Sequence, residues 1–186
     1  MIWVLVILIA LVVAVGLAFM FSYNGLVGLR NKIEAAYAQI DVQLNRRYDL
    51  IPNLVETVKG YAQHESGTLE AVIAARNSAM AANSIEDKAQ AENVISGALK
   101  SIFALSEAYP DLKANTNFQQ LQPELSSTED RIAYARQYYN DNVRAYNTKI
   151  QAFPSVIVAN LFKFTAREYF EADDQSRGTV AVDFGA

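Results

Sequence analysis

The sequence contains no cysteine among its 186 residues and only one histidine, His64. Without cysteine the chain cannot form disulfides, use a thiol nucleophile, or bind zinc or an iron–sulfur cluster through thiolates. One histidine also excludes the zinc-protease helix, which needs two histidines four residues apart, and the di-iron bundle, which needs paired Glu-x-x-His motifs. The sequence therefore predicts no metal centre and no cofactor.

Glycine is scarce, and the charge is slightly acidic. None of the eight glycines belongs to a Gly-x-Gly-x-x-Gly loop or a phosphate loop, and no Gly-x-Ser-x-Gly elbow occurs. Sixteen basic against twenty acidic residues give a net charge of −4, which provides no field to attract nucleic acid. We therefore predict a protein without catalysis. A hydrolase built on Ser66, His64 and an acidic residue remains an alternative.

One uncharged apolar run, Ile2 to Phe21, is long enough to cross a membrane. Trp3 and Tyr23 bracket it at the two levels where aromatic rings meet lipid headgroups. The alternatives are a cleaved signal peptide and a buried core helix. A signal peptide requires a Lys or Arg before its apolar run, and none precedes this one. Arg30 and Lys32 follow the span, so the positive-inside rule predicts that the bulk of the chain is cytoplasmic.

The next forty residues carry one apolar stripe with a period near 3.5, typical of a long helix that supercoils against partners. Asn24-Gly25 is too weak a break to separate this stalk from the span, so we expect one continuous helix. Pro52 should kink it, because proline lacks the donor for the Tyr48 carbonyl. The stripe consists of Leu26, Ile33, Tyr37, Ile40, Leu44, Ile51, Leu54, Val58 and Tyr61.

Three further long helices are expected. After a turn at residues 64–67, an alanine-rich helix covers Leu69 to Ala82 and breaks at Asn83. Residues 84–87 resemble a capping arrangement that opens a helix ending at Tyr109-Pro110. A long connection at 111–122 precedes the last helix, which begins at Ser126 or Ser127 and ends before Pro154. The apolar seam of that helix comprises Ile132, Tyr139, Val143, Tyr146, Ile150 and Phe153.

Two C-terminal segments are apolar without belonging to this pattern. Val156 to Phe162 is too short to span a bilayer, and it is interpreted as core, with interfacial membrane contact as the alternative. Thr179 to Val182 is strand-like.

Arg47 is the charged residue that occupies a seam position, between Ile40 and Leu54. A buried charge is costly unless it is paired, so Arg47 needs a carboxylate from another helix. The candidates are Glu107, Glu129 and Asp130. Two interpretations stay open: a docking or oligomer-specifying site, or an arginine whose stem packs while its head reaches water.

Tyrosines cluster on the last helix. They are interpreted first as core and rim residues. Their hydroxyls would define a binding face only if several are exposed together. The four positions are 134, 138, 139 and 146.

Several segments together resemble the LemA family over nearly the whole chain. They are Tyr23–Val27, Gln43–Val55, Ala75–Arg76, Ala108–Asn115, Arg144–Asn147 and Phe153–Pro154. The resemblance implies a single-pass bacterial membrane protein with a compact antiparallel helical bundle and no established enzymatic activity. A relative implicated in forming magnetosome membranes suggests scaffolding or membrane organisation. Pro123 departs from the pattern, because such proteins are expected to continue a helix at that position.

These observations predict an all-α fold, with an N-terminal transmembrane helix that continues into a long-helix antiparallel four-helix-type bundle. The expected division is an anchor at 1–22, a bundle at 23–174 and a tail at 175–186. The membrane-interface residues are Trp3 and Tyr23. Candidate structural or interaction residues are Arg46, Arg47, Asp49, Pro52, Asn53, Tyr109, Pro110, Tyr146, Phe153 and Pro154.

The predicted function is a bacterial membrane-anchored scaffold that acts by self-association or by docking a protein partner. Besides the lipid bilayer, a homo-oligomer is expected, because anchoring raises the effective concentration of neighbouring copies. Surplus apolar residues off the stalk seam would supply the contacts, together with the tail. A monomeric adaptor for a soluble partner is the alternative. The off-seam residues are Val27, Leu29, Val42, Leu50 and Val55.

Overall fold

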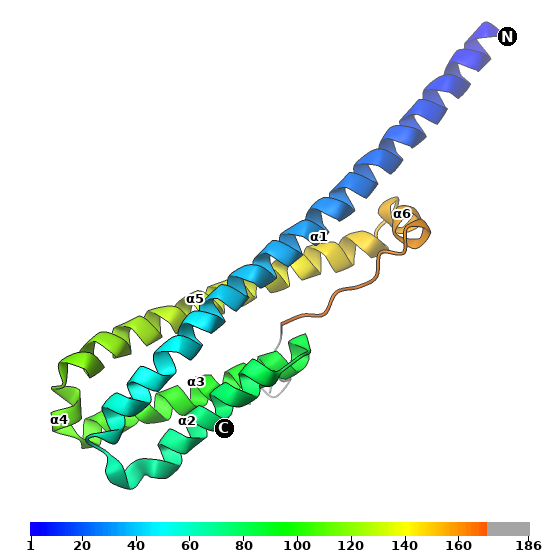
Figure 1. Cartoon of the computed structure of the whole chain (residues 1–186). Helices are drawn as coiled ribbons and strands as arrows, with labels where there is room; N and C mark the ends of the chain where they lie inside the picture. Colours follow the sequence, from blue (N-terminus) through cyan, green and yellow to red (C-terminus); the bar gives the residue numbers. More distant parts are fainter. Residues whose placement is uncertain (171–186) are drawn as a thin grey trace, which may run out of the picture. The chain divides into compact units, whose positions relative to one another are not determined.

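The computed structural model describes residues 1–170, which form six α-helices and one 3-10 helix and, within this range, no strand (Figure 1). The all-α prediction is confirmed. Four helices are long, as expected, and α4 and α6 are short additions. The elements are α1 (Ile2–Lys59), η1 (Gln63–Glu65), α2 (Ser66–Ala81), α3 (Ile85–Ala108), α4 (Pro110–Lys113), α5 (Thr116–Gln151) and α6 (Ser155–Leu161).

Helix α1 has 58 residues, so it extends over roughly 87 Å at 1.5 Å per residue. It passes through Asn24-Gly25 without a break, as predicted. By length and composition its N-terminal part can cross a membrane, and its most apolar window is not buried by the described chain. Trp3 is 79% exposed within that part. The expected span and stalk are therefore one helix.

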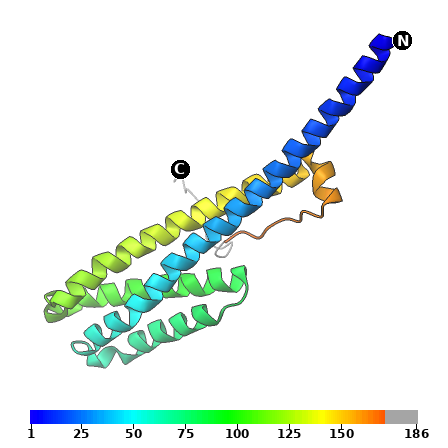
Figure 2. The same cartoon turned by 45° about the horizontal axis from the view of Figure 1, so that its top comes forward.

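The described chain divides into two compact units, and each contains part of α1 and part of α5. Unit 1 comprises residues 1–47 and 126–169. In it the two long helices lie side by side and antiparallel in both views (Figures 1 and 2). The ring of Tyr37 lies 6.0 Å from that of Tyr139, while Arg47 pairs with Glu129. Positions thus rise along one helix as they fall along the other.

Unit 2 comprises residues 48–125 and, in the described chain, Phe170. Helices α2 and α3 lie side by side as a hairpin in both views (Figures 1 and 2). Ser84 begins α3 as its N-cap, with its hydroxyl oxygen accepting from the Asp87 amide at 3.0 Å. The predicted capping arrangement is confirmed. Ring contact between Phe103 and Phe118, at 6.4 Å, joins α3 to α5.

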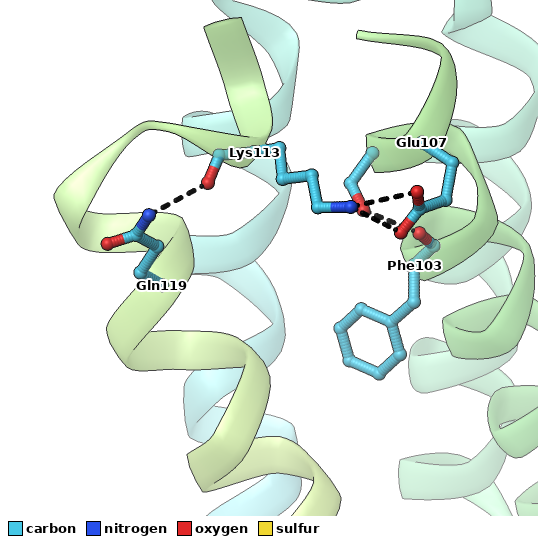
Figure 3. Close-up of polar contacts among 5 residues, drawn as sticks. Phe103, Glu107, Lys113 and Gln119 are labelled. Atoms are coloured by element: carbon cyan, nitrogen blue, oxygen red, sulfur yellow. Dashed lines mark hydrogen bonds and ion pairs between the residues drawn. The ribbon is translucent and has the colours of Figure 1, made fainter. Parts of the chain in front are cut away.

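The expected long connection at 111–122 is wrong. Figure 3 shows a tight polar junction instead: Lys113 Nζ donates to both carboxylate oxygens of Glu107, at 2.9 and 2.8 Å, and Gln119 Nε2 donates to the Lys113 carbonyl at 3.1 Å. Helix α5 begins at Thr116 because Asn115 caps it, with its side-chain oxygen accepting from the Phe118 amide at 3.0 Å.

The predicted start of the last helix at Ser126 or Ser127 is therefore also wrong. Helix α5 passes through Pro123, which is exposed. Proline at this position forgoes one backbone hydrogen bond, but its ring meets solvent and does not disturb the core. The departure from the LemA pattern does not interrupt the helix.

The apolar seams are confirmed for most of their residues, with Tyr37 and Ile150 half-buried and two aromatic residues as exceptions. The fully buried residues of α1 follow the predicted spacing, but Tyr61 lies beyond the helix end and is 42% exposed. Phe153 likewise follows the end of α5 and is 81% exposed. Each aromatic lies past the last helical turn, so periodicity no longer sets its direction. Of the off-seam residues, Val55 is buried and Val42 is 59% exposed.

The Val156–Phe162 segment forms α6, and its assignment to the core is right for only part of it. Val158 and Ala159 are buried, but Ile157, Leu161 and Phe162 are about half exposed or more, at 50%, 64% and 52%. Thr179 to Val182 lies outside the described residues.

Candidate functional site

A buried ion pair joins the two long helices of unit 1. The Arg47 side chain is 0% exposed, and its Nη1 donates to Oε1 of Glu129, one of the three carboxylates named from the sequence. The Glu129 side chain keeps 27% exposure. Burial lowers the pKa of the neighbouring Arg136, the positive charge of Arg47 lowers it further, and Glu129 opposes both. The prediction that Arg47 is buried and paired is confirmed.

The next residue along α1 makes a second buried polar contact, within unit 2. Tyr48 is 5% exposed, and its hydroxyl donates to Oε1 of Glu92, which is 0% exposed and lies on α3. Arg76 of α2 donates from Nε to the Tyr48 carbonyl at 2.7 Å. Pro52 lacks the amide that would bond this carbonyl inside a helix, so Arg76 takes the place of that donor. Helix α1 continues through Pro52.

The other candidate residues of the Gln43–Val55 segment are exposed to solvent. Arg46, Asp49, Pro52 and Asn53 are all exposed on α1. The segment therefore combines two buried residues, Arg47 and Tyr48, with these solvent-exposed ones.

Tyr109 and Pro110 form the junction between α3 and α4. Pro110 is the first residue of α4, where its missing amide costs nothing. The Tyr109 hydroxyl lies 3.3 Å from Oε1 of Glu65, to which it donates. Burial raises the pKa of Tyr109, and the negative charge of Glu65 raises it further. This pair is structural within unit 2.

The tyrosines of α5 divide into two kinds. Tyr139 and Tyr146 are buried in unit 1, and burial raises the pKa of each. The Tyr139 hydroxyl donates to the Glu168 carbonyl at 3.0 Å. Tyr134 and Tyr138 are 74% and 48% exposed, one helical turn apart. Two exposed tyrosines together meet the condition for a binding face.

A groove of about 510 Å³ runs beside these two tyrosines, between α1 and α5 of unit 1. We call it the tyrosine groove. Its rim carries a carboxylate, a guanidinium and amides, while the aromatic rings supply apolar surface. It is lined by Gln39, Gln43, Ser127, Asp130, Arg131, Tyr134, Ala135 and Tyr138.

The alternative hydrolase was expected around Ser66 and His64. Ser66 lines a pocket of about 330 Å³ in unit 2 with Glu56, Lys59 and Glu70, but His64 is not among the residues of that pocket. In residues 1–170 no cluster of three or more histidine or acidic side chains is placed to hold a metal ion. The tyrosine groove is therefore the better candidate for a functional surface.

Comparison with known proteins identifies the relatives. A model of the LemA family matches residues 36–184. The chain belongs to the LemA family. It is 29% identical over 171 residues to Protein LemA of Metamycoplasma hominis, which covers 87% of this chain and 76% of that protein.

Two magnetosome proteins are more distant relatives of this LemA-family chain. It is 23% identical to magnetosome protein MamQ of Magnetospirillum gryphiswaldense, over 81% of this chain and 65% of that protein. It is 24% identical to magnetosome protein MamQ 1 of Paramagnetospirillum magneticum, over 86% of this chain and 68% of that protein. With the apolar part of α1, these similarities indicate a membrane-associated helical protein.

Arg76 belongs to a segment that resembles the LemA family, but no role was assigned to it from the sequence. Its contact with the Tyr48 carbonyl depends on Pro52, 24 residues earlier. Pro52 lies inside a strongly periodic helix, so the sequence could have predicted that the carbonyl four residues earlier needs a donor other than the backbone amide. The identity of that donor requires the tertiary fold.

Proposed function

We propose that this LemA-family protein is a membrane-anchored scaffold that acts by docking a helix into the tyrosine groove. The single observation that carries the proposal is the joint exposure of Tyr134 and Tyr138 at the edge of that groove. Two other tyrosines of the same helix, Tyr139 and Tyr146, are buried in the core. Tyr134 and Tyr138, by contrast, are 74% and 48% exposed.

The composition of the groove suits a helical partner. Tyrosine gives large contact area with little loss of conformational entropy, and it is enriched at protein interfaces. From Ser127 to Tyr138 the α5 wall comprises twelve residues, and its ends are roughly 16 Å apart at 1.5 Å per residue, about three turns of a docked helix. Asp130 and Arg131 at the rim offer charges of both signs, which favour a partner of mixed charge.

A second copy of the chain is the preferred occupant. Val42 is 59% exposed and lies one helical turn from Gln39 on the same side of α1, so apolar surface continues beyond the groove. Copies anchored in one membrane meet at high effective concentration, so a modest contact is sufficient for assembly. The magnetosome relatives are compatible with a role in membrane organisation.

The test is the mass of the full-length protein in lipid nanodiscs or native lipid particles, measured by light scattering at micromolar concentration. We expect an oligomer, and we expect Tyr134→Ala combined with Tyr138→Ala to dissociate it without loss of helical signal. Met80→Ala with Val94→Ala is the matched control, because both residues are exposed and lie in unit 2. Oligomers unchanged by the tyrosine pair would exclude the groove as the contact.

The adaptor alternative has a distinct outcome. A protein that stays monomeric in lipid, yet crosslinks through a photoreactive group at residue 134 to one soluble protein in cells, would replace self-association with partner docking. Sidedness is tested separately. Because the chain has no cysteine, Asn83→Cys can be probed on intact cells with an impermeant thiol reagent. A cytoplasmic body predicts labelling only after lysis.

A further inference from the structure

The exposed apolar residues around α6 gather at the end of unit 1 where the apolar run of α1 ends. Tyr23, two residues beyond that run, packs against two aromatic rings that follow α6. Its ring centroid lies 4.8 Å from that of Phe162 and 5.9 Å from that of Phe164. These contacts hold α6 beside the start of the stalk, and both figures draw α6 next to α1 (Figures 1 and 2).

The height of α6 follows from the geometry of α1. Phe21 is the last apolar residue of the run and Tyr23 is two residues later, which is roughly 3 Å along the helix axis. The headgroup layer on each side of a bilayer is roughly 5–8 Å thick, given a hydrocarbon core of about 30 Å within a total of about 40–45 Å. A helix attached at Tyr23 therefore lies at headgroup level when the run spans the membrane.

Helix α6 has one apolar side packed and another unpacked. Val158 and Ala159 are buried, whereas Ile157 and Leu161, one turn apart, are 50% and 64% exposed. Phe153, just before α6, is 81% exposed. In water such a surface is unfavourable, but at a headgroup boundary these side chains can enter the acyl region.

Most of the charges around this surface are positive, although Glu34 lies 3.7 Å from Arg167 and Asp141 lies 3.6 Å from Arg144. Residues 1–33 and 142–167 contain no Asp or Glu. Arg30 lies 5.8 Å from the ring centroid of Phe164, and Lys149 Nζ lies against the backbone of Gly25, where a Cβ would collide with it. The cations of these two segments are Arg30, Lys32, Arg144, Lys149, Lys163 and Arg167. Such a group attracts anionic lipid headgroups.

Lys163 ends α6 in a conformation that would suit glycine better. Its φ is 56°, and the Phe164 amide donates back to the Ala159 carbonyl at 2.9 Å. The left-handed region is unfavourable for lysine, and glycine would avoid that strain. Lys163 places a positive charge directly after the exposed end of α6.

We propose that α6 and its flanking aromatics form a membrane-surface foot, made of Phe153, Ile157, Leu161 and Phe162, which inserts into the headgroup boundary while neighbouring cations contact anionic headgroups. The occupant is lipid. The proposal rests on the membrane span of α1 and is independent of docking in the tyrosine groove. In this arrangement the protein contacts the membrane twice, through the spanning part of α1 and through the foot at the membrane surface.

The experiment uses full-length protein in vesicles of phosphatidylcholine with phosphatidylglycerol. The cysteine-free chain permits single cysteines carrying an environment-sensitive fluorophore at Ile157, Leu161, Leu11 and Val94. Quenchers are lipids with a nitroxide near the headgroup or deep in the acyl chain. We expect the shallow quencher to reduce fluorescence at Ile157 and Leu161, the deep one to act at Leu11, and neither at Val94.

Each other outcome overturns the proposal in its own way. Quenching at Leu11 without quenching at Ile157 and Leu161 would mean that the span inserts but the foot does not. An apolar emission spectrum at Leu161 without lipid quenching would mean that protein covers it. Absence of quenching at Leu11 would show that the apolar run of α1 does not insert into the bilayer, and the proposal would lose its premise. Lys163→Gly keeps the turn and removes the charge, and it should weaken shallow quenching at Leu161 only in anionic vesicles.

Discussion

The contact between Arg76 and the Tyr48 carbonyl predicts an energetic coupling between Arg76 and Pro52, two residues 24 positions apart. Inside a helix the amide of residue 52 would bond the carbonyl of residue 48, but Pro52 has no amide, and Arg76 Nε donates to that carbonyl at 2.7 Å. Removing Arg76 from the native protein therefore leaves a partly buried carbonyl without its charged donor. In a variant that has an amide at residue 52, removal of Arg76 leaves the Tyr48 carbonyl bonded to that amide.

The magnitudes follow from the type of hydrogen bond. A bond from a charged donor contributes about 1.5–3 kcal/mol, and the lower half applies here because the bond is only part-buried. We expect Arg76→Leu to lower the free energy of unfolding by about 1.5–2 kcal/mol. Pro52 is exposed, so Pro52→Ala loses little packing and gains a helical hydrogen bond, a net stabilisation of about 1–2 kcal/mol after the greater entropy of the unfolded chain is counted.

The double variant decides the matter. If the alanine introduced by Pro52→Ala supplies the amide, Arg76→Leu should cost about 1 kcal/mol less in that background than in the native sequence. The assay is urea unfolding of the full-length protein in a mild detergent, followed by circular dichroism at 222 nm. Arg131→Leu serves as a control for loss of an exposed arginine. Strictly additive effects of the two substitutions would refute the reasoning.

Three further predictions concern stability in the same assay. Arg47→Ala should cost about 3 kcal/mol, at the lower end for a broken buried pair because Glu129 keeps 27% exposure, and Glu129→Ala should cost more because Arg47 has none. Ser84→Ala should cost about 1 kcal/mol through loss of the α3 cap, whereas Ser78→Ala on exposed α2 surface should be near neutral. Stability should fall as the pH rises above about 10, because burial raises the pKa of Tyr139 in the folded state and the unfolded chain loses its proton first. Tyr139→Phe should flatten that fall, and an unchanged pH profile would contradict it.

Much of the fold is predictable from the sequence because its signals are local. The 3.5-residue spacing of Leu26, Ile33 and Ile40 identifies the buried side of α1, and all three are buried. Ser84 is recognised as a cap because the Ser-x-x-Asp pattern acts within one turn. Burial of Arg47 follows from its seam position, and only the choice among three carboxylates needed the structure.

The remaining features depend on contacts that the sequence does not encode locally. Asn115 was missed as a cap because Pro123 suggested a later start, and the cost of a proline depends on whether its ring meets solvent or core. The groove was partly predictable, since Tyr139 and Tyr146 occupy seam positions whereas Tyr134 and Tyr138 do not. The foot required the ring contacts of Tyr23, which join residues about 140 positions apart in the sequence.

The buried polar pairs explain how a repetitive helix selects one register. Sliding α1 by seven residues would place Ile40 or Leu54 where Arg47 now meets Glu129, and the apolar seam would be preserved. Hydrophobic burial therefore distinguishes such registers weakly, while an unpaired buried arginine would cost several kcal/mol in the wrong one. Tyr48 adds a second constraint within unit 2, because its hydroxyl donates to the buried Glu92 of α3 and would lose this acceptor in another register. Each of these two adjacent residues thus favours one register of α1 within its own unit.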